Sequence, residues 1–140
     1  RYSRFLGSIN NITMLYNWRK YSSVSQLEFL NFLGAVDVGL FSLSKEHTAH
    51  NFPGKILGYM NASLPILGSV NPGNDLLSLL NEAGAGRVYV NGEDALLAEA
   101  ALKLLESKKL RLKLGERANS LLVEEFSVEA AVMGIMSKVN

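Results

Sequence analysis

The chain has 140 residues, of which 48% are hydrophobic, 19% charged and 9% aromatic. A chain of this length and apolar content buries roughly two thirds of its unfolded surface as one globular domain, which excludes a disordered or collagen-like chain. It has no cysteine, so a small disulfide-braced scaffold is excluded as well. Its 14 Lys and Arg residues against 13 Asp and Glu give a net charge of +1, which provides no general attraction to nucleic acid.

We expect no targeting or membrane-spanning segment within this sequence. No apolar run approaches the roughly 18 residues of a membrane span, and no charged leader or cleavage site precedes the folded pattern. Because the first residue is Arg1 rather than Met, we expect an excerpt of a longer protein. The absence of cysteine fits a reducing compartment, although it equally fits a secreted domain without disulfides.

The apolar pattern begins with a strand and a capped helix. Residues 12–16 form a short run with β-branched and aromatic members, which is typical of a strand. Ser25 and Glu28 have the spacing of a capping box, so we expect a helix to begin there and to end at Gly34, a residue that tolerates the left-handed turn past a helix end. Residues 35–41 are predicted as a buried strand and residues 42–51 as a loop.

Helices and strands alternate through the rest of the chain. The expected elements are a helix from Pro53 to about residue 61, a strand at 64–68, a turn at 71–74, a helix with apolar residues at 76–80 that Gly84 and Gly86 end, a strand at 87–90, and C-terminal helices at 94–107, at 110–125 and after Ser127. This alternation implies right-handed crossovers and an α/β fold with a mostly parallel sheet covered on both faces. Ligands of such sheets bind at the carboxyl ends of the strands, so the informative stretches follow Tyr16, Phe41, Leu67 and Val90.

The first candidate site is the loop and helix start at residues 51–56. A helix start offers unpaired amides and about half a positive charge, which suits a phosphate. Gly54 lets the backbone approach a ligand closely, and Lys55 adds a mobile cation. The alternative is that Pro53 and Gly54 only start a helix and that Lys55 is solvated.

The second candidate is the loop at residues 67–75, which is rich in glycine and capping residues. Together with the first loop it would clamp a diphosphate, with Ser69 and Asn74 as neutral donors. The alternative is ordinary turn chemistry, because Asn-Pro-Gly-Asn is what a tight connection requires.

Single histidine and aromatic residues give weaker signals. His47 and His50 stand three apart, but without cysteine or a carboxylate partner they make an incomplete metal site. His50 is alternatively a general base or an ordinary loop residue. Trp18, directly after Tyr16 and Asn17, either stacks on a nucleotide base or packs in the core.

A basic run extends over residues 103–117. Six cations stand there against two glutamates. Such a run is usually the solvated face of a helix pair; alternatively it lies near anionic lipid, where each basic side chain contributes about 1 kcal/mol.

The order of several segments resembles one known family. The segments are residues 37–41, residues 52–60 with 64–67, and the closing helices from Leu104 to Ser127. They resemble the C-terminal donor-binding domain of retaining GT-B glycosyltransferases of family 4, in the branch that builds bacterial surface polysaccharides. The resemblance covers residues 10–139, and residues 51–74 in particular resemble N-acetyl-L-fucosamine transferases of O-antigen and capsule assembly.

This resemblance implies a Rossmann-like partial domain over residues 1–140 that binds a nucleotide-sugar donor. The implied reaction transfers a sugar with retention from a nucleoside diphosphate, with UDP as the expected nucleotide, to a lipid-linked glycan. It implies diphosphate contacts at Phe52, Pro53, Gly54 and Lys55, with Ser69 beside them, and nucleoside contacts at Tyr16, Asn17 and Trp18. We expect no cofactor and no metal.

The family's paired glutamates are replaced in this chain. Alignment of residues 55–60 on the family's helix puts the first glutamate at His50, beside the donor sugar, and the second at Gly58, where the family holds the ribose. The family's Gly-rich turn with its Arg and Lys, two strands and the acceptor-binding domain are absent. We therefore expect no turnover by the chain alone, and pairing of exposed strand edges with a second copy. The expected location is cytoplasmic, with peripheral contact at the inner face of the membrane.

Two other functions remain open at this point. A GT-B nucleotide-sugar 2-epimerase would need acid and base carboxylates, which this stretch does not display. A non-catalytic flavodoxin-like receiver or interaction module would use Asp37 as an acceptor at a strand. That module needs an acidic pair after its first strand to bind Mg²⁺, and residues 16–18 supply none.

Overall fold

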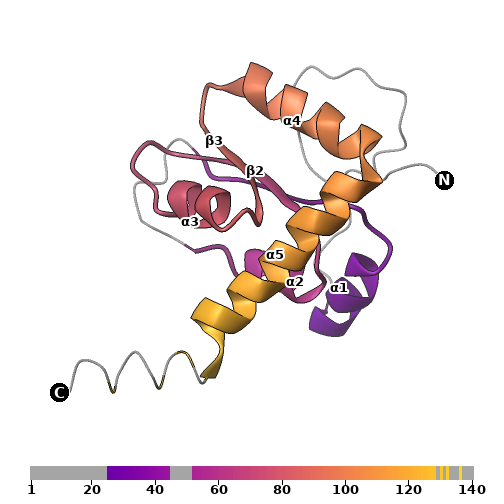
Figure 1. Ribbon diagram of the computed structural model, residues 1–140, viewed down its shortest axis with the longest axis vertical. Helices are drawn as coiled ribbons and strands as arrows, with labels where there is room; N and C mark the ends of the chain where they lie inside the picture. Colours follow the sequence, from indigo (N-terminus) through magenta and orange to yellow (C-terminus); the bar gives the residue numbers. More distant parts are fainter. Residues whose placement is uncertain (1–24, 45–51, 129, 131, 133–135, 137–140) are drawn as a thin grey trace.

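The structure is a computed structural model that describes residues 25–44, 52–128, 130, 132 and 136. Within them a parallel sheet has the order β1-β2-β3 and lies between helices on its two faces (Figure 1). The elements are α1 (Gln26–Leu33), β1 (Gly39–Ser42), α2 (Gly54–Asn61), β2 (Ile66–Val70), α3 (Leu76–Glu82), β3 (Gly86–Val90), α4 (Asp94–Glu106) and α5 (Lys108–Phe126). The expected α/β fold, with a Rossmann-like parallel sheet, is confirmed.

Alternating side chains of the sheet build two apolar layers. Ile66 and Val70 of β2 pack with α2, α3 and α5 on one face, whereas Leu67 packs with α4 and the start of α5 on the other. Helices α2 and α3 lie on the same face because the strand order advances in one direction and each crossover is right-handed. In Figure 1, α5 crosses in front of this layer and α4 lies above it.

Strand β2 begins and ends two residues later than the sequence pattern predicts. The predicted strand at 64–68 is in fact Ile66–Val70, so Ser69 lies inside the strand rather than in the following loop. Gly68 is needed in the sheet because a Cβ at this position would overlap the ring of Phe41 on β1. Packing of a neighbouring strand therefore overrides the low strand propensity of Gly and Ser.

The first described helix confirms its predicted start. Ser25 Oγ accepts the N–H of Glu28 at 3.3 Å, and the Glu28 carboxylate accepts the N–H of Ser25 at 2.8 Å, which completes the capping box. The expected left-handed turn at Gly34 is wrong, because this residue keeps a right-handed φ of −66°. Strand β1 is also shorter than predicted, since residues 35–38 form a bend and only Gly39 starts the ladder.

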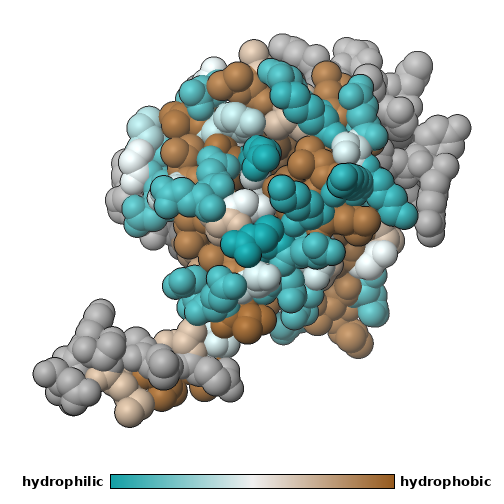
Figure 2. Space-filling view, viewed as in Figure 1, coloured by the Kyte–Doolittle hydropathy of each residue, from teal (hydrophilic) through white to brown (hydrophobic). Residues whose placement is uncertain are grey.

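Helix α5 packs closely on the connection between α2 and β2. A Cβ at Gly115 would overlap the carbonyl oxygen of Ser63, so the helix approaches the backbone itself. Asn119 donates to the carbonyl oxygen of Met60 at 3.3 Å, and Arg117 Nε donates to that of Ala83 at 3.0 Å. The outward side of α5 is mostly polar, with Leu112 and Val123 exposed among the polar side chains (Figure 2).

The two edges of the described sheet differ. Side chains cover the outer backbone of β3: the amide of Asn81 pairs with Val88, and the carboxylate of Glu93 accepts the N–H of Val90 at 2.8 Å. On β1 the Tyr59 hydroxyl donates to the carbonyl oxygen of Leu40 at 3.1 Å. Within the described ranges the N–H groups of Leu40 and Ser42 have no partner. Among the described residues, the less covered edge is therefore that of β1.

Some predictions fall on other parts of the chain. The strand at 12–16 and most of the loop at 42–51 lie outside the described residues. Ser127 does cap a further turn, since its Oγ accepts the N–H of Ala130 at 3.0 Å.

Candidate functional site

The carboxyl ends of the three strands are tied together by two asparagines. Asn71 and Asn91 directly follow Val70 and Val90, which are partners in the parallel register. Asn91 Nδ2 donates to Asn71 Oδ1 at 2.6 Å and to the carbonyl oxygen of Leu43 at 3.0 Å. Asn71 Nδ2 donates to the carbonyl oxygen of Ser44 at 2.9 Å. These amides fix the ends of all three strands and so form the floor of the candidate site.

A pair of serine hydroxyls lies one step before these ends. Ser42 and Ser69 are partners in the β1–β2 register, and their Oγ atoms lie 3.0 Å apart. Ser69 is buried with 8% exposure, whereas Ser42 is exposed. Only one hydroxyl donates in this contact, so the other keeps a proton for a further acceptor. Ser69 is thus placed at the predicted edge, but inside the sheet.

The start of α2 is open and uncapped. Its N-cap residue is Pro53, whose side chain makes no cap hydrogen bond, and the first turn has no acidic residue. The first helical bond is donated by Ile56, and the N–H groups of Gly54 and Lys55 have no partner within the described residues. A Cβ at Gly54 would meet nothing within 4 Å. Within the described residues, no side chain therefore covers the positive end of this helix.

This open start distinguishes α2 from the other helices of the described ranges. Ser25 caps α1, Asn74 Oδ1 accepts the N–H of Leu76 at 3.0 Å in α3, and Ser107 caps α5. Helix α4 has no side-chain cap but carries Asp94 in its first turn. An oxygen acceptor or an acidic side chain thus serves each of these helix starts, and α2 has neither.

Lys55 adds a cation at this open start. The side chain is exposed, yet the surrounding protein displaces enough water to lower the pKa of its ammonium below the ordinary 10.5. Desolvation disfavours the charged form, and a bound anion would favour it. Lys55 is therefore suited to an anionic ligand.

The residues next to this start are held by packing. The ring of Phe52 lies 5.1 Å from the ring of Phe126, at an angle of 47°. Gly58 faces α1, because a Cβ there would lie 2.9 Å from the Phe29 ring. Phe52, Pro53, Gly54 and Lys55 thus lie together at the start of α2. Gly58 packs against α1, and its contact with the ribose stays a prediction.

Several candidates cannot be placed. Tyr16, Asn17, Trp18, His47 and His50 lie outside the described residues. Within the described part of the chain, no three His, Asp or Glu side chains gather as metal ligands. No helix there is long and apolar enough to cross a bilayer.

The link between the two asparagines was not predicted from the sequence. Asn71 lies in the second candidate loop and Asn91 in the stretch after Val90, but neither side chain was assigned a role, although both stand directly after a strand. The sequence pattern that could have indicated this link is that each asparagine directly follows the last residue of a strand. Parallel strands that are in register, as Val70 and Val90 are, place such residues side by side.

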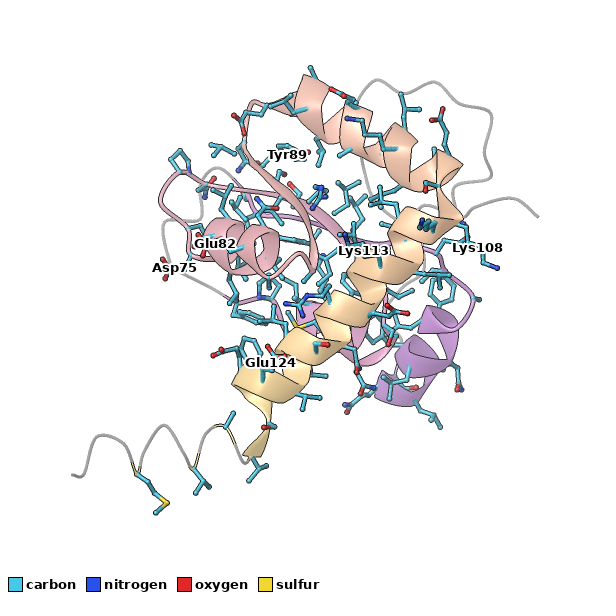
Figure 3. All side chains as sticks on the ribbon, viewed as in Figure 1. Asp75, Glu82, Tyr89, Lys108, Lys113 and Glu124 are labelled. Carbon is cyan, nitrogen blue, oxygen red and sulfur yellow. The ribbon has the colours of Figure 1, made fainter. Side chains whose placement is uncertain are left out.

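Asp37 and the basic run lie away from the start of α2. Asp37 precedes β1, at the amino edge of the sheet, and its Oδ1 lies 3.8 Å from Arg111 Nη2. In the basic run the lysines at 108, 109 and 113 are exposed, which fits a solvated helix face. Figure 3 shows Lys108 and Lys113 on α5.

Comparison with known proteins adds no relative. No family model matches the chain, and neither a curated protein nor a solved structure matches it.

Proposed function

We propose that the chain binds a nucleoside diphosphate sugar at the carboxyl edge of its sheet, as the donor-binding part of a retaining GT-B-type glycosyltransferase. The observation that carries this proposal is the uncapped start of α2 with Lys55 in its first turn. A helix start carries about half a positive charge, and free amides at this edge of a parallel sheet are a common anion site.

The diphosphate would lie against the amides of Gly54 and Lys55, with the Lys55 ammonium as its counter-ion. As the bond from the sugar to the diphosphate breaks, negative charge grows on the leaving oxygen. Amides and a cation that are already in place stabilise that charge without reorganisation. In this proposal the acceptor, a lipid-linked glycan, is bound outside the described residues, and the exposed lysines of α5 contact anionic headgroups at the inner face of the membrane.

The open edge of β1 bears on self-association. Side chains cover the outer edge of β3, whereas the N–H groups of Leu40 and Ser42 on β1 have no partner within the described residues. We therefore propose β1 as the edge that pairs with a second copy.

The position of Asp37 does not favour the receiver module. Such a module needs its acceptor carboxylate where ligands bind, at the carboxyl edge, and Asp37 lies at the amino edge beside Arg111.

Isothermal titration calorimetry with UDP tests the proposal. Replacement Lys55→Ala removes one charge-assisted contact and should weaken binding about tenfold or more. The matched control is Lys108→Ala, an exposed lysine in the first turn of α5. The variant Gly54→Asp places a carboxylate at the open helix start, so it should lose UDP binding while its unfolding temperature rises. Equal affinity in the unmodified chain, Lys55→Ala and Gly54→Asp would reject the assignment.

A further inference from the structure

A hollow of about 280 Å³ lies between β3 and α4, on the sheet face opposite α2. Its polar lining comes from Arg87, Tyr89, Glu99 and Lys103, and its apolar lining from α4 and Leu110 of α5. Figure 3 shows Tyr89 below α4, between that helix and β3. The volume is slightly below the roughly 300–1,000 Å³ of typical ligand pockets, which indicates a small ligand.

Arg87 differs in its contacts from the other arginines that the structure describes. Arg111 Nη1 donates to the carbonyl oxygens of Leu104 and Leu105 at the end of α4. Arg117 Nε likewise donates to the end of α3. Arg87 makes one hydrogen bond, from Nη1 to the carbonyl oxygen of its own neighbour Gly86 at 2.8 Å, and no carboxylate of the described residues pairs with it. Its guanidinium, with five N–H donors, is therefore largely unused by the fold.

A second cation faces the same hollow. Lys103 Nζ pairs with Glu99 Oε1 at 2.6 Å, one helical turn away on α4. Arg87 lines the same hollow from β3. Two cations against one carboxylate leave the hollow with a net positive charge. A net positive charge beside an apolar wall favours an anionic ligand.

The remaining wall is apolar. The side chains of Leu96, Ala100, Leu104 and Leu110 line the hollow. Leu96 is 46% exposed, so part of this wall faces solvent. A hydrated inorganic ion would leave this wall uncovered, whereas a ligand with an apolar body would cover it.

We propose that this hollow is a second ligand site, which binds a small organic anion with a phosphate or carboxylate head and an apolar body. The head accepts hydrogen bonds from the Arg87 guanidinium and from the Tyr89 hydroxyl, with Lys103 as a further cation. The body lies against Leu96 and Leu110. The site is on the α4 face of the sheet, so it is separate from the proposed donor site at the start of α2.

The test uses NMR titration of the 140-residue chain with phenyl phosphate, inorganic phosphate and benzyl alcohol as probes. Phenyl phosphate should shift the signals of Tyr89, Leu96 and Leu110 saturably. Inorganic phosphate supplies only the anionic head and benzyl alcohol only the apolar body, so each should bind at least about tenfold more weakly than phenyl phosphate.

Variants separate the site from general charge effects. Arg87→Gln should weaken phenyl phosphate binding about tenfold, the loss expected for a charge-assisted hydrogen bond. Lys108→Gln removes an exposed charge from α5 and should leave the affinity unchanged. The unfolding temperature of Arg87→Gln should stay close to that of the unmodified chain, because the hydrogen bond that Arg87 makes within the described residues is to its neighbour Gly86. The proposal is overturned by phenyl phosphate that fails to saturate, by equal binding of all three probes, or by an Arg87→Gln variant that is folded and binds with full affinity.

Discussion

The side-chain amide of Asn81 pairs with both backbone polar groups of Val88, donating to the carbonyl oxygen at 2.8 Å and accepting from the N–H at 2.9 Å. The amide thus takes the place of a neighbouring strand at the outer edge of β3. A free edge of this kind is a template for pairing with other chains. Asn81 therefore serves as an internal block on association at this edge.

Replacement Asn81→Leu should open this edge. The loss of two partly buried hydrogen bonds should lower the free energy of unfolding by about 1–3 kcal/mol. The exposed backbone should also make the chain associate as its concentration rises, which sedimentation velocity measures. The control is Glu82→Gln on the same helix, which should behave as the unmodified chain does. A strictly unchanged sedimentation profile for a folded Asn81→Leu variant would show that the edge is not blocked by this amide.

Gly115 and Gly54 should respond oppositely to the same substitution. A Cβ at Gly115 would overlap the carbonyl oxygen of Ser63, a backbone atom that cannot turn away, so Gly115→Ala should cost about 1–3 kcal/mol or more. A Cβ at Gly54 meets open space, and Gly54→Ala should be neutral or stabilise by up to about 1 kcal/mol. Urea denaturation of the two variants tests this, and similar stabilities would contradict the close approach of α5 to the backbone at Ser63.

Asn91→Asp should make stability depend on pH. The amide of Asn91 donates to two acceptors, and a carboxylate in its place would face both with negative charge. The folded state should therefore favour the protonated acid and raise its pKa above the ordinary value of about 3.9. A folded-state pKa above the unfolded one means that stability falls as the pH rises through this window.

Thermal unfolding of this variant between mildly acidic and neutral pH measures the effect. At neutral pH the penalty should be about 1–3 kcal/mol relative to the unmodified chain, and it should shrink on acidification. A penalty that is independent of pH would mean that Asn91 does not act as a donor at the strand ends.

Lys55 should give the unmodified chain a stability that rises at alkaline pH. Desolvation lowers the pKa of its ammonium in the folded state below the ordinary 10.5. The unfolded chain then binds more protons in the window between the two pKa values, so stability increases as the pH rises through it. Lys55→Gln should lack this increase. Identical pH profiles for the two proteins, measured by urea denaturation up to pH 10.5, would contradict the desolvation of Lys55.

The order of helices and strands was predictable from the sequence, because caps and apolar periods are local signals. The Ser25 capping box and the turn at Gly84, where φ is 68°, needed only neighbouring residues to be found. The exact span of β2 was not predictable, because it depends on the ring of Phe41 packing over Gly68 from another strand.

Part of the candidate site was predictable, because that part depends only on neighbouring residues in the sequence. The open start of α2 follows from Pro53, Gly54 and Lys55 alone. The link from Asn91 to Asn71 depends on the register of β2 with β3, which no local pattern specifies. The hollow beside Arg87 requires the position of α4 on the sheet, which is set by packing of the whole domain.

The central claim, that the start of α2 binds the diphosphate of a nucleotide sugar, is tested most directly by the amide signals of its first turn. In an NMR titration with UDP, the N–H signals of Gly54 and Lys55 should shift saturably, since amides that have no partner among the described residues acquire one. The signal of Asp37, at the opposite edge of the sheet, should stay in place. The claim would be contradicted by saturable UDP shifts at other residues with none at Gly54 and Lys55. It would also be contradicted if UDP caused no shifts and Mg²⁺ shifted the signal of Asp37.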